Sequence, residues 1–418
     1  MTGVKKYVII GNGAAAVNCV EGIRSLDREG EITLVSEEKY ATYCRPLISY
    51  YLEGKTDTER MRYRPQDFYE KNGCSVLYGR RAVRLDAQKK LVELEDGTAL
   101  SYDALCVASG SHPFVPPTEG LEKVKKRFCF LTLEDALALE RAITPESRVL
   151  IVGAGLIGLK CAEGLHGRVA SLTVCDLADR VLPSILDEEG AALVQKKLEE
   201  HGISLRLADP AVRYEADAAF LKSGVRIPFD ILVTAVGVRP NAALVTGAGG
   251  AGSRGIAVDT RMRTSLAEVY AAGDCTESTD ISDGNVKIMA LLPNAVMQGF
   301  CAGVNMAGGS SVFDCAVPMN AIGFFGLHVM TAGSRPSLSD GAEVYEEHTD
   351  NSLKKLFIRD NRLVGFELVG QTERAGIYTS LLRNGTPLDS LDFERLKKVP
   401  DLSAFRAENR RKMLRGMV

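Results

Sequence analysis

The stretch KYVIIGNGAAAVNCVEGI, residues 6–23, decides the fold. Its first residues are an apolar run that predicts a β-strand, and the small and apolar residues that follow predict a helix. Between them Gly11, Gly13 and Ala16 stand at the GxGxxA spacing of a dinucleotide-binding turn. Glycine at the first position permits a tight turn, glycine at the second lets a pyrophosphate approach the backbone, and a small third residue keeps helix and strand close.

An acid follows at the expected distance. The next predicted strand, EITLVSEE (residues 31–38), ends in Glu37 and Glu38, about 20 residues past the fingerprint, where an acid can accept both ribose hydroxyls. We take Glu37 as the candidate. A glycine-rich turn without a nucleotide is the alternative, and the combination of strand, helix and acid disfavours it.

A second copy of this pattern lies in SRVLIVGAGLIGLKCAEGL, residues 147–165, with Gly153, Gly155 and Gly158 at the fingerprint positions. The strand SLTVCD (residues 171–176) follows it. Two dinucleotide units in one chain imply two dinucleotides.

The acid that ends the second strand indicates which nicotinamide cofactor binds. Asp176 would repel the 2′-phosphate of NADPH and hydrogen-bond a free 2′-hydroxyl. Leu177 and Ala178 offer no cation for a phosphate. The sequence therefore favours NADH over NADPH.

Composition excludes several other classes. The 418 residues are enough for two or three domains, and 51 basic against 54 acidic residues give a net charge of -3, which indicates no nucleic-acid partner. No segment approaches the roughly 20 apolar residues of a membrane span. The apolar run near the start of the chain is too short for the apolar region of a signal peptide. We expect a cytoplasmic protein that binds no membrane. The ten cysteines include no CxxC pair, so we predict no metal site.

Three further segments complete a known pattern: YDALCVASGSHPFVPP (residues 102–117), DILVTAVGVRPN (residues 230–241) and VYAAGDCTE (residues 269–277). With the two fingerprints they resemble the FAD-dependent pyridine nucleotide-disulfide oxidoreductase superfamily, in its order, from about Tyr7 to Gly308. The resemblance implies an α/β fold with two Rossmann-like domains and an α+β C-terminal interface domain. It implies a split FAD domain (residues 1–115 and 246–315), an inserted NADH domain (residues 116–245) and an interface domain (residues 316–418).

The resemblance also implies roles for single residues. Asp274 would hold the flavin ribityl chain, Ala108 to Gly110 would close the crossover, and a helix opening at Pro293 would point its N-terminus at the flavin pyrimidine. The candidate FAD-binding residues are Gly11, Gly13, Ala16, Glu37, Arg45, Val83, Ala108, Ser109, Gly110, Gly273, Asp274 and Pro293. The candidate NADH-binding residues are Gly153, Gly155, Gly158, Asp176 and Gly237.

YATYCRPLISYY, residues 40–51, contains a cysteine with two interpretations. Cys44 is either a redox nucleophile, as in the single-cysteine branch with NADH peroxidase, NADH oxidase and coenzyme A-disulfide reductase, or a bystander that packs near the flavin. The peroxidase and oxidase members carry a histidine where this chain has Ala14, which favours the bystander. Coenzyme A-disulfide reductases lack that histidine too, so this argument does not reach them.

Charged residues near the flavin depart from the family pattern. Arg45 is expected along the FAD pyrophosphate, because its guanidinium suits phosphate oxygens, with a solvated surface arginine as the alternative. Relatives often carry a lysine where this chain has Tyr50 and a glutamate where it has Lys160, so the sequence indicates that this lysine-glutamate pair is missing. Lys160 either faces the isoalloxazine, as a candidate catalytic residue, or is an ordinary lysine on the helix surface.

The stretches CRPLISYYLEGK (residues 44–55) and VPMNAIGFFGLHVMTAG (residues 317–333) look most like the NADH:rubredoxin and ferredoxin-reductase-like branch, whose kin include flavoprotein subunits of anaerobic 2-oxoacid and aldehyde oxidoreductases. This implies electron transfer between NADH and rubredoxin, ferredoxin or an iron-sulfur subunit, in a homodimer or a hetero-oligomeric complex. A slowly turning redox-sensing flavoprotein is a further alternative.

The C-terminal residues are strongly basic. Eight basic residues against Asp401 and Glu408 make this end a candidate docking site for an acidic carrier, with a solvated, frayed helix as the alternative. The basic residues are Arg395, Lys397, Lys398, Arg406, Arg410, Arg411, Lys412 and Arg415.

Overall fold

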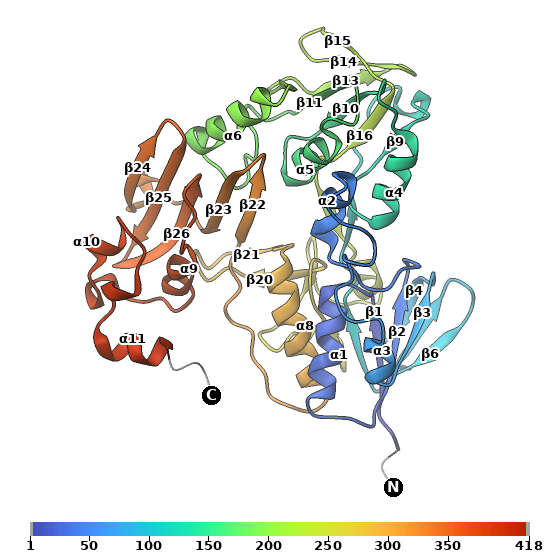
Figure 1. Cartoon of the computed structure of the whole chain (residues 1–418). Helices are drawn as coiled ribbons and strands as arrows, with labels where there is room; N and C mark the ends of the chain where they lie inside the picture. The colour runs from blue at the N-terminus through green and yellow to red at the C-terminus, as the bar shows by residue number, and fades with distance from the viewer. Residues whose placement is uncertain (1–2, 415–418) are drawn as a thin grey trace.

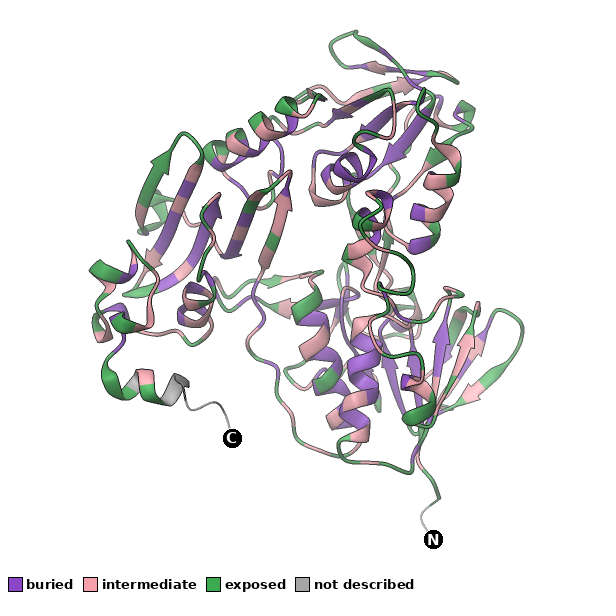
Figure 2. Ribbon diagram, in the orientation of Figure 1, coloured by how far each residue is buried: buried purple, intermediate pink, exposed green. Residues whose placement is uncertain are grey.

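The computed structural model describes residues 3–414. Figure 1 shows two α/β units, one above the other, and a C-terminal unit beside them. Buried residues concentrate on the central strands of all three units and on the helices that cover them (Figure 2). This arrangement confirms the predicted α/β fold class with parallel sheets.

The first α/β unit is built on a parallel sheet in the strand order β19-β7-β1-β2-β3. Its strands are β1 (Lys6–Ile10), β2 (Glu31–Ser36), β3 (Cys74–Tyr78), β7 (Ala104–Val107) and β19 (Val269–Ala271). The apolar residues of β1 and β7 are buried, as in sheets covered on both faces. A strand near residue 270 thus completes a sheet that begins at residue 6.

Two helices cover one face of this sheet, α1 (Ala14–Arg24) and α8 (Leu292–Met306). They approach closely because glycines stand at the contact: a Cβ on Gly299 would lie 2.1 Å from the Ala15 carbonyl oxygen. Gly303 meets the Cys19 carbonyl oxygen in the same way. The fit fixes the N-terminal turn of α8 beside that of α1.

The second α/β unit repeats the plan with the parallel order β12-β11-β10-β16-β9. Its strands are β9 (Arg127–Phe128), β10 (Arg148–Val152), β11 (Ser171–Cys175), β12 (Ile203–Arg206) and β16 (Ile231–Thr234). Its helices are α4 (Leu133–Ala142), α5 (Leu156–Leu165) and α6 (Glu188–Glu200). Thr132 and Asp135 begin α4 with a capping box.

Small sheets and short helices complete the two units. The two chain crossings between them pair as β8 (Ser111–Pro113) and β17 (Val238–Pro240), and Asn241 Nδ2 donates to the Ser109 carbonyl at 2.8 Å. The other small sheets are β4 (Ala82–Asp86), β5 (Leu91–Leu94), β6 (Ala99–Ser101); β13 (Ala211–Tyr214), β14 (Ala218–Leu221), β15 (Arg226–Pro228); and β18 (Ile256–Ala257), β20 (Thr276–Thr279), β21 (Val286–Lys287). The short helices are α2 (Ile48–Leu52), α3 (Phe68–Lys71) and α7 (Ala243–Thr246).

The C-terminal unit is an antiparallel sheet in the order β22-β23-β26-β25-β24. Its strands are β22 (Met319–Phe324), β23 (Leu327–Gly333), β24 (Glu343–Thr349), β25 (Ser352–Arg359) and β26 (Arg362–Val369), followed by α9 (Gly376–Arg383), α10 (Phe393–Leu396) and α11 (Ala407–Leu414). The domain boundaries at residues 115, 245 and 315 stay predictions.

The basic C-terminal stretch does not consist of solvated helix alone. Leu396, Ala404 and Phe405 are buried with Tyr378 in the core of the C-terminal unit. Arg395, Lys398 and Arg406 are exposed on either side of these buried residues. Arg415 and the side chain of Lys412 fall outside the described residues. Within residues 3–414, no helix is long and apolar enough to cross a membrane.

Candidate functional site

The first fingerprint forms a tight turn that is open on one side. Gly11 has φ +115°, and a Cβ there would lie 2.1 Å from the Ala108 carbonyl oxygen, so no other residue fits. Gly13 begins α1 with no side-chain cap from the described residues, and an added Cβ would meet nothing within 4 Å. Ala16, the third fingerprint residue, is fully buried. The turn therefore offers an anion unpaired backbone N–H groups at a helix N-terminus.

A polar cluster that the motifs did not indicate holds the segment around residue 42 over this turn. Thr42 Oγ1 donates to Asn12 Oδ1 at 2.7 Å, and the Tyr69 hydroxyl also contacts that oxygen. Asn12 Nδ2 donates to the Tyr40 carbonyl at 3.3 Å. Spacing in the sequence carries no sign of this cluster, because its members come from three separate segments.

The acids after β2 differ in their contacts. Glu38 pairs with Arg45 at 2.7 Å and accepts a hydrogen bond from the Tyr43 hydroxyl, whereas Glu37 is exposed. Arg45 thus lies beside the segment that follows β2, with 40% of its side chain exposed. Val83 on β4 is half exposed. The cofactor-binding roles of Glu37, Arg45 and Val83 stay predictions.

The segment after β19 brings polar groups to the same place. Gly273 has φ +85°, and its N–H donates to Gln298 Oε1 at 2.8 Å. Burial raises the pKa of the Asp274 carboxyl, and the charge of Arg45 opposes that rise, so these two predicted residues lie near each other.

The first turn of α8 carries a buried acceptor without a partner. The helix begins at Leu292, one residue before the predicted Pro293, and Asn294 is 1% exposed. Among the described residues, Asn294 Oδ1 has no hydrogen-bond partner. Buried polar atoms of this kind normally have a partner, so a polar ligand fits here. The uncapped turn at Gly13, Asp274 and Asn294 together fit FAD.

The second fingerprint has the same geometry. Gly153 has φ +119° and a Cβ there would lie 2.3 Å from the Ala235 carbonyl oxygen, while a Cβ on Gly158 would lie 2.0 Å from the Gly153 carbonyl oxygen. Gly155 begins α5, has no side-chain cap in the described part of the chain and leaves open space at its Cβ. The three glycines are therefore placed as a dinucleotide requires.

Asp176 is held at the end of β11 by the fingerprint itself. Its Oδ2 accepts the Ala154 N–H at 2.5 Å and its Oδ1 accepts the Ala178 N–H at 2.7 Å. The carboxylate is thus fixed beside the turn. Gly237, with φ +123°, lies in the crossing between β16 and β17, where its carbonyl accepts the Phe114 N–H. Binding roles for both stay predictions.

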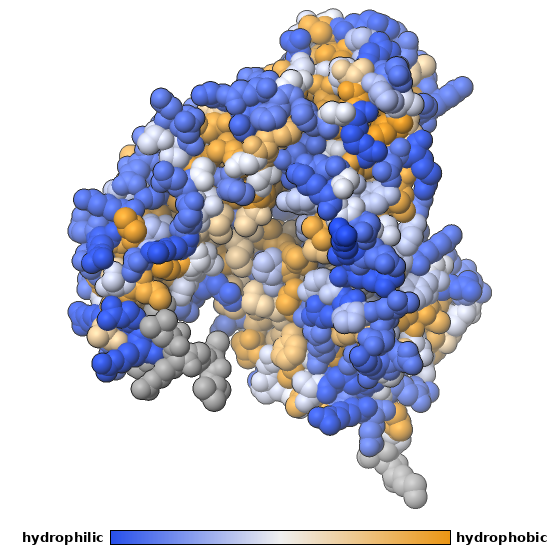
Figure 3. Space-filling view, viewed as in Figure 1, coloured by the Kyte–Doolittle hydropathy of each residue, from blue (hydrophilic) through white to orange (hydrophobic). Residues whose placement is uncertain are grey.

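A cavity of about 650 Å³ lies where the three units meet. Figure 3 shows the surface hollowed between the C-terminal unit and the two α/β units. The lining includes Leu156 from the second fingerprint, Met289 and Leu291 before α8, Asn320 on β22, and Arg335. The lining therefore comes from all three units and includes one residue of the second fingerprint.

Cys44 lies at the start of a 3-10 turn (Arg45–Leu47), and its N–H donates to the Met61 carbonyl at 2.7 Å. Burial raises the pKa of its thiol. A thiol with a raised pKa is protonated at neutral pH, which disfavours a resting thiolate nucleophile.

Lys160 is not an ordinary surface lysine. Its side chain is 19% exposed and its ammonium pairs with Glu163, one turn further along α5. The same ammonium lies 5.0 Å from the centre of the Tyr50 ring. Lys160 thus pairs within its own helix, because a helix places residues three apart side by side. This pair differs from the lysine-glutamate pair of the relatives, whose two positions are Tyr50 and Lys160 in this chain. A catalytic role of Lys160 stays a prediction.

The sequence of this chain is similar to those of several known proteins. The family model described as pyridine nucleotide-disulphide oxidoreductase matches residues 5–299. The chain is 32% identical to the NADH-dependent phenylglyoxylate dehydrogenase subunit epsilon of Aromatoleum evansii, covering 92% of this chain and 93% of that one. It is 32% identical to an NADH oxidase of Methanocaldococcus jannaschii (87% of each chain) and 28% identical to a rubredoxin-NAD(+) reductase of Pseudomonas putida (88% of this chain, 97% of that one).

Solved structures share the fold. The reduced CoADR-RHD of Bacillus anthracis superposes with a TM-score of 0.86 at 23% identity, over 94% of this chain and 76% of that one. Putidaredoxin reductase, in its covalent complex with putidaredoxin, superposes with a TM-score of 0.85 at 23% identity, over 99% of both chains. At this identity the likeness shows the fold alone.

Proposed function

Because this chain belongs to the pyridine nucleotide-disulphide oxidoreductase family, we propose that it is an FAD-dependent oxidoreductase that passes electrons between NADH and a protein electron carrier. The observation that carries the proposal is the pair of uncapped fingerprint turns, at Gly13 and Gly155, on two parallel sheets, together with a cavity where these two units meet the C-terminal unit. Two dinucleotides bound there would meet at their reactive rings.

The residues of the first α/β unit would hold FAD. Gly11 and Gly13 receive the pyrophosphate, Asp274 accepts hydroxyl hydrogen bonds from the ribityl chain, and Asn294 supplies a buried acceptor near the first turn of α8. When bound, FAD supplies two-electron exchange with NADH and one-electron exchange with an iron centre. The chain itself supplies proximity and orientation.

The residues of the second unit would hold NADH. Gly153 to Gly158 receive its pyrophosphate, and Asp176, fixed by two backbone N–H groups, faces the adenine ribose. A fixed carboxylate repels the additional phosphate of NADPH, which supports NADH as the substrate.

The partner that we propose is an iron-sulfur or rubredoxin-type carrier protein, or a subunit of a larger complex. Relatives named as a rubredoxin reductase and as a subunit of a dehydrogenase support this class. We also propose a cytoplasmic location and assembly as a homodimer or within a hetero-oligomeric complex. Because one relative is named as an NADH oxidase, oxygen is a second acceptor to be tested.

The exposed part of the basic C-terminus would contribute to carrier docking. Arg406 and Arg411 are exposed, and Arg410 is partly exposed. Because removal of residues 395–418 would also remove buried Leu396 and Phe405, charge reversal of Arg406 and Arg411 is the cleaner test. Salt-insensitive transfer at an unchanged rate in that variant would contradict docking at this surface.

The function is tested by anaerobic reduction of the flavin-loaded protein with NADH, followed by mixing with rubredoxin, a ferredoxin, oxygen, peroxide or coenzyme A disulfide. We expect fast reduction by NADH and fast re-oxidation by an iron protein. Re-oxidation only by oxygen, peroxide or disulfide would contradict the proposed acceptor class. A long-lived reduced species with every acceptor would favour a redox sensor.

A further inference from the structure

Glu163 is a buried acid on α5 that neither dinucleotide fingerprint uses. Its side chain is 7% exposed. Its Oε1 accepts the backbone N–H of Phe325 at 2.7 Å, and its Oε2 pairs with Lys160 on the same helix. One carboxylate thus joins the second α/β unit to the C-terminal unit.

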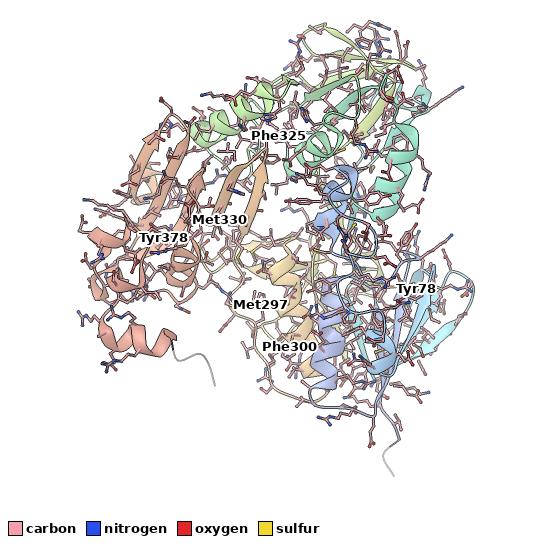
Figure 4. All side chains as sticks on the ribbon, in the orientation of Figure 1. Tyr78, Met297, Phe300, Phe325, Met330 and Tyr378 are labelled. Atoms are coloured by element: carbon pink, nitrogen blue, oxygen red, sulfur yellow. The ribbon has the colours of Figure 1, made fainter. Side chains whose placement is uncertain are left out.

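The segment that Glu163 holds is the tip of the β22–β23 hairpin. Phe325 has φ +49°, a backbone conformation that a phenylalanine rarely adopts without support from its surroundings. Its ring stacks on His201 at 4.0 Å between centres and meets the edge of His166 at 5.0 Å. Figure 4 labels Phe325 at this tip, between helices α6 and α5 of the second α/β unit. Both the backbone and the ring of this residue are therefore fixed by the second unit.

Lys160 adds two further attachments. Its ammonium donates to the Gly323 carbonyl of the hairpin at 3.3 Å and lies 5.6 Å from the Phe324 ring centre. It also faces the Tyr50 ring of α2. Helix α2 packs on α5, since a Cβ on Gly164 would lie 3.0 Å from the Ser49 carbonyl oxygen. Segments from all three units converge on the Lys160–Glu163 pair.

The Lys160–Glu163 pair lies near the cavity, because α5 and β22, the two elements that it joins, both contribute residues to the cavity lining. Leu156, which lines the cavity, precedes Lys160 by one turn of α5. Asn320, which also lines the cavity, lies on β22 four residues before Phe324. The two elements that the pair joins, α5 and β22, thus both extend to the cavity.

We infer that Glu163 is a positioning residue: by fixing the hairpin tip and neutralising Lys160, it sets the width of the cavity in which NADH meets the flavin. The inference rests on the proposed function. The Glu163 carboxylate contacts Lys160 and Phe325 and not the fingerprint turn or Asp176, so its loss should change how the rings stack and leave the adenine half of NADH bound.

The test uses stopped-flow reduction of the flavin-loaded protein by NADH. Glu163→Ala removes the acceptor for Phe325 and leaves Lys160 unpaired. We expect its limiting reduction rate to fall at least about tenfold, because a misplacement of about 1 Å can lower a rate by about 10²-fold, while the Kd for NADH changes less than about threefold. Glu163→Gln keeps an acceptor for the Phe325 N–H and leaves Lys160 with its contacts to the hairpin, and should keep the rate within about threefold of wild type.

Hydrogen exchange gives a second readout that needs no turnover. The amides of residues 323–327 should exchange about tenfold or more faster in Glu163→Ala than in wild type, and close to the wild-type rate in Glu163→Gln. Glu146→Gln, an exposed glutamate before β10, is the matched control and should behave as wild type in both measurements.

Three results would overturn the inference. These are an unchanged limiting rate in Glu163→Ala, a Glu163→Gln variant as slow as Glu163→Ala, or unchanged hairpin exchange in Glu163→Ala. If Glu163→Ala does not fold, Phe325→Ala carries the test, because it removes the ring contacts and leaves both charges paired; an unchanged rate there also overturns it. If the wild-type protein holds FAD but is not reduced by NADH, the proposed function itself is wrong. If the wild type is reduced normally and only the variants depart from expectation, the inference about Glu163 alone is wrong.

Discussion

The Glu367 carboxylate, fully buried on β26, accepts the backbone N–H of Asp187 at 3.2 Å, at the residue that begins α6. The contact joins residues 180 apart in the chain and ties the C-terminal unit to the second α/β unit. A Cβ on Gly190 would lie 2.0 Å from Glu367 Oε1, so the helix fits closely around the acid. Lys355, 10% exposed, pairs with the Asp187 side chain at 2.6 Å.

Glu367 makes this contact sensitive to pH. Burial, together with the negative charge of Asp187, raises the pKa of Glu367 to about 8, and Arg335 at 3.5 Å only partly opposes the rise. Below that pH the folded protein keeps a proton that the unfolded chain has lost, so stability falls as pH rises from the usual glutamate range to about 8. Each pH unit in this window lowers the stability of the folded state by up to about 1.4 kcal/mol.

We therefore expect Glu367→Gln to lose this dependence. In thermal unfolding between pH 5.5 and pH 9, the Tm of the variant should rise relative to that of the wild type by about 1 °C for each kcal/mol of stability that the wild type loses. Glu343→Gln, an exposed acid on the neighbouring part of the same sheet, should follow the wild-type curve. Parallel curves for wild type and Glu367→Gln would contradict a neutral Glu367 at low pH.

A substitution at Gly155 can test nucleotide binding without disturbing the fold. Its added Cβ would meet nothing within 4 Å in the chain, so Gly155→Ala should fold and keep FAD. The methyl group stands where a pyrophosphate must approach, and we expect the Kd for NADH, measured by titration, to rise about tenfold or more. Gly376→Ala at the start of α9 has equally open space and should bind NADH as the wild type does. Normal NADH affinity in Gly155→Ala would place the pyrophosphate elsewhere.

The parts of the site that sequence predicts are those encoded within short segments. The fingerprint at Gly153, Gly155 and Gly158 and the acid Asp176 lie close in the chain, and their spacing fixes their geometry. The contacts Glu163–Phe325 and Glu367–Asp187 depend on how whole units dock, and no spacing indicates docking.

Lys160 shows the same limit within a helix. Periodicity places it on α5, but only the packed structure shows that β22 and α2 cover that face and leave Glu163 as its partner. The sequence did contain one signal for this pair: Glu163 stands three residues after Lys160, and residues at this spacing are neighbours on a helix surface.

Asp176 should control the choice between NADH and NADPH. A unit charge at about 4 Å from the phosphate acts by about 1–4 kcal/mol, so Asp176→Asn should lower the preference for NADH by about tenfold or more. The amide oxygen still accepts one backbone N–H, which limits the damage to the turn. The check is the ratio of kcat/KM for the two cofactors, with Asp217→Asn, an exposed acid in the same unit, as control. An unchanged ratio would mean that Asp176 does not face the 2′ position.

Cys44 decides between electron transfer to a carrier and thiol chemistry. Burial raises the pKa of its thiol, so at neutral pH it holds less thiolate than a free cysteine. We therefore expect Cys44→Ser, which changes one atom and keeps the N–H contact to Met61, to reduce with NADH and pass electrons to rubredoxin or ferredoxin within about twofold of the wild-type rates. Cys129→Ser is the matched control for loss of a thiol. Cys129 is also half-buried, and burial raises the pKa of its thiol too. If turnover in the wild type requires peroxide or coenzyme A disulfide and disappears in Cys44→Ser alone, the cysteine is the nucleophile and the carrier is not the acceptor.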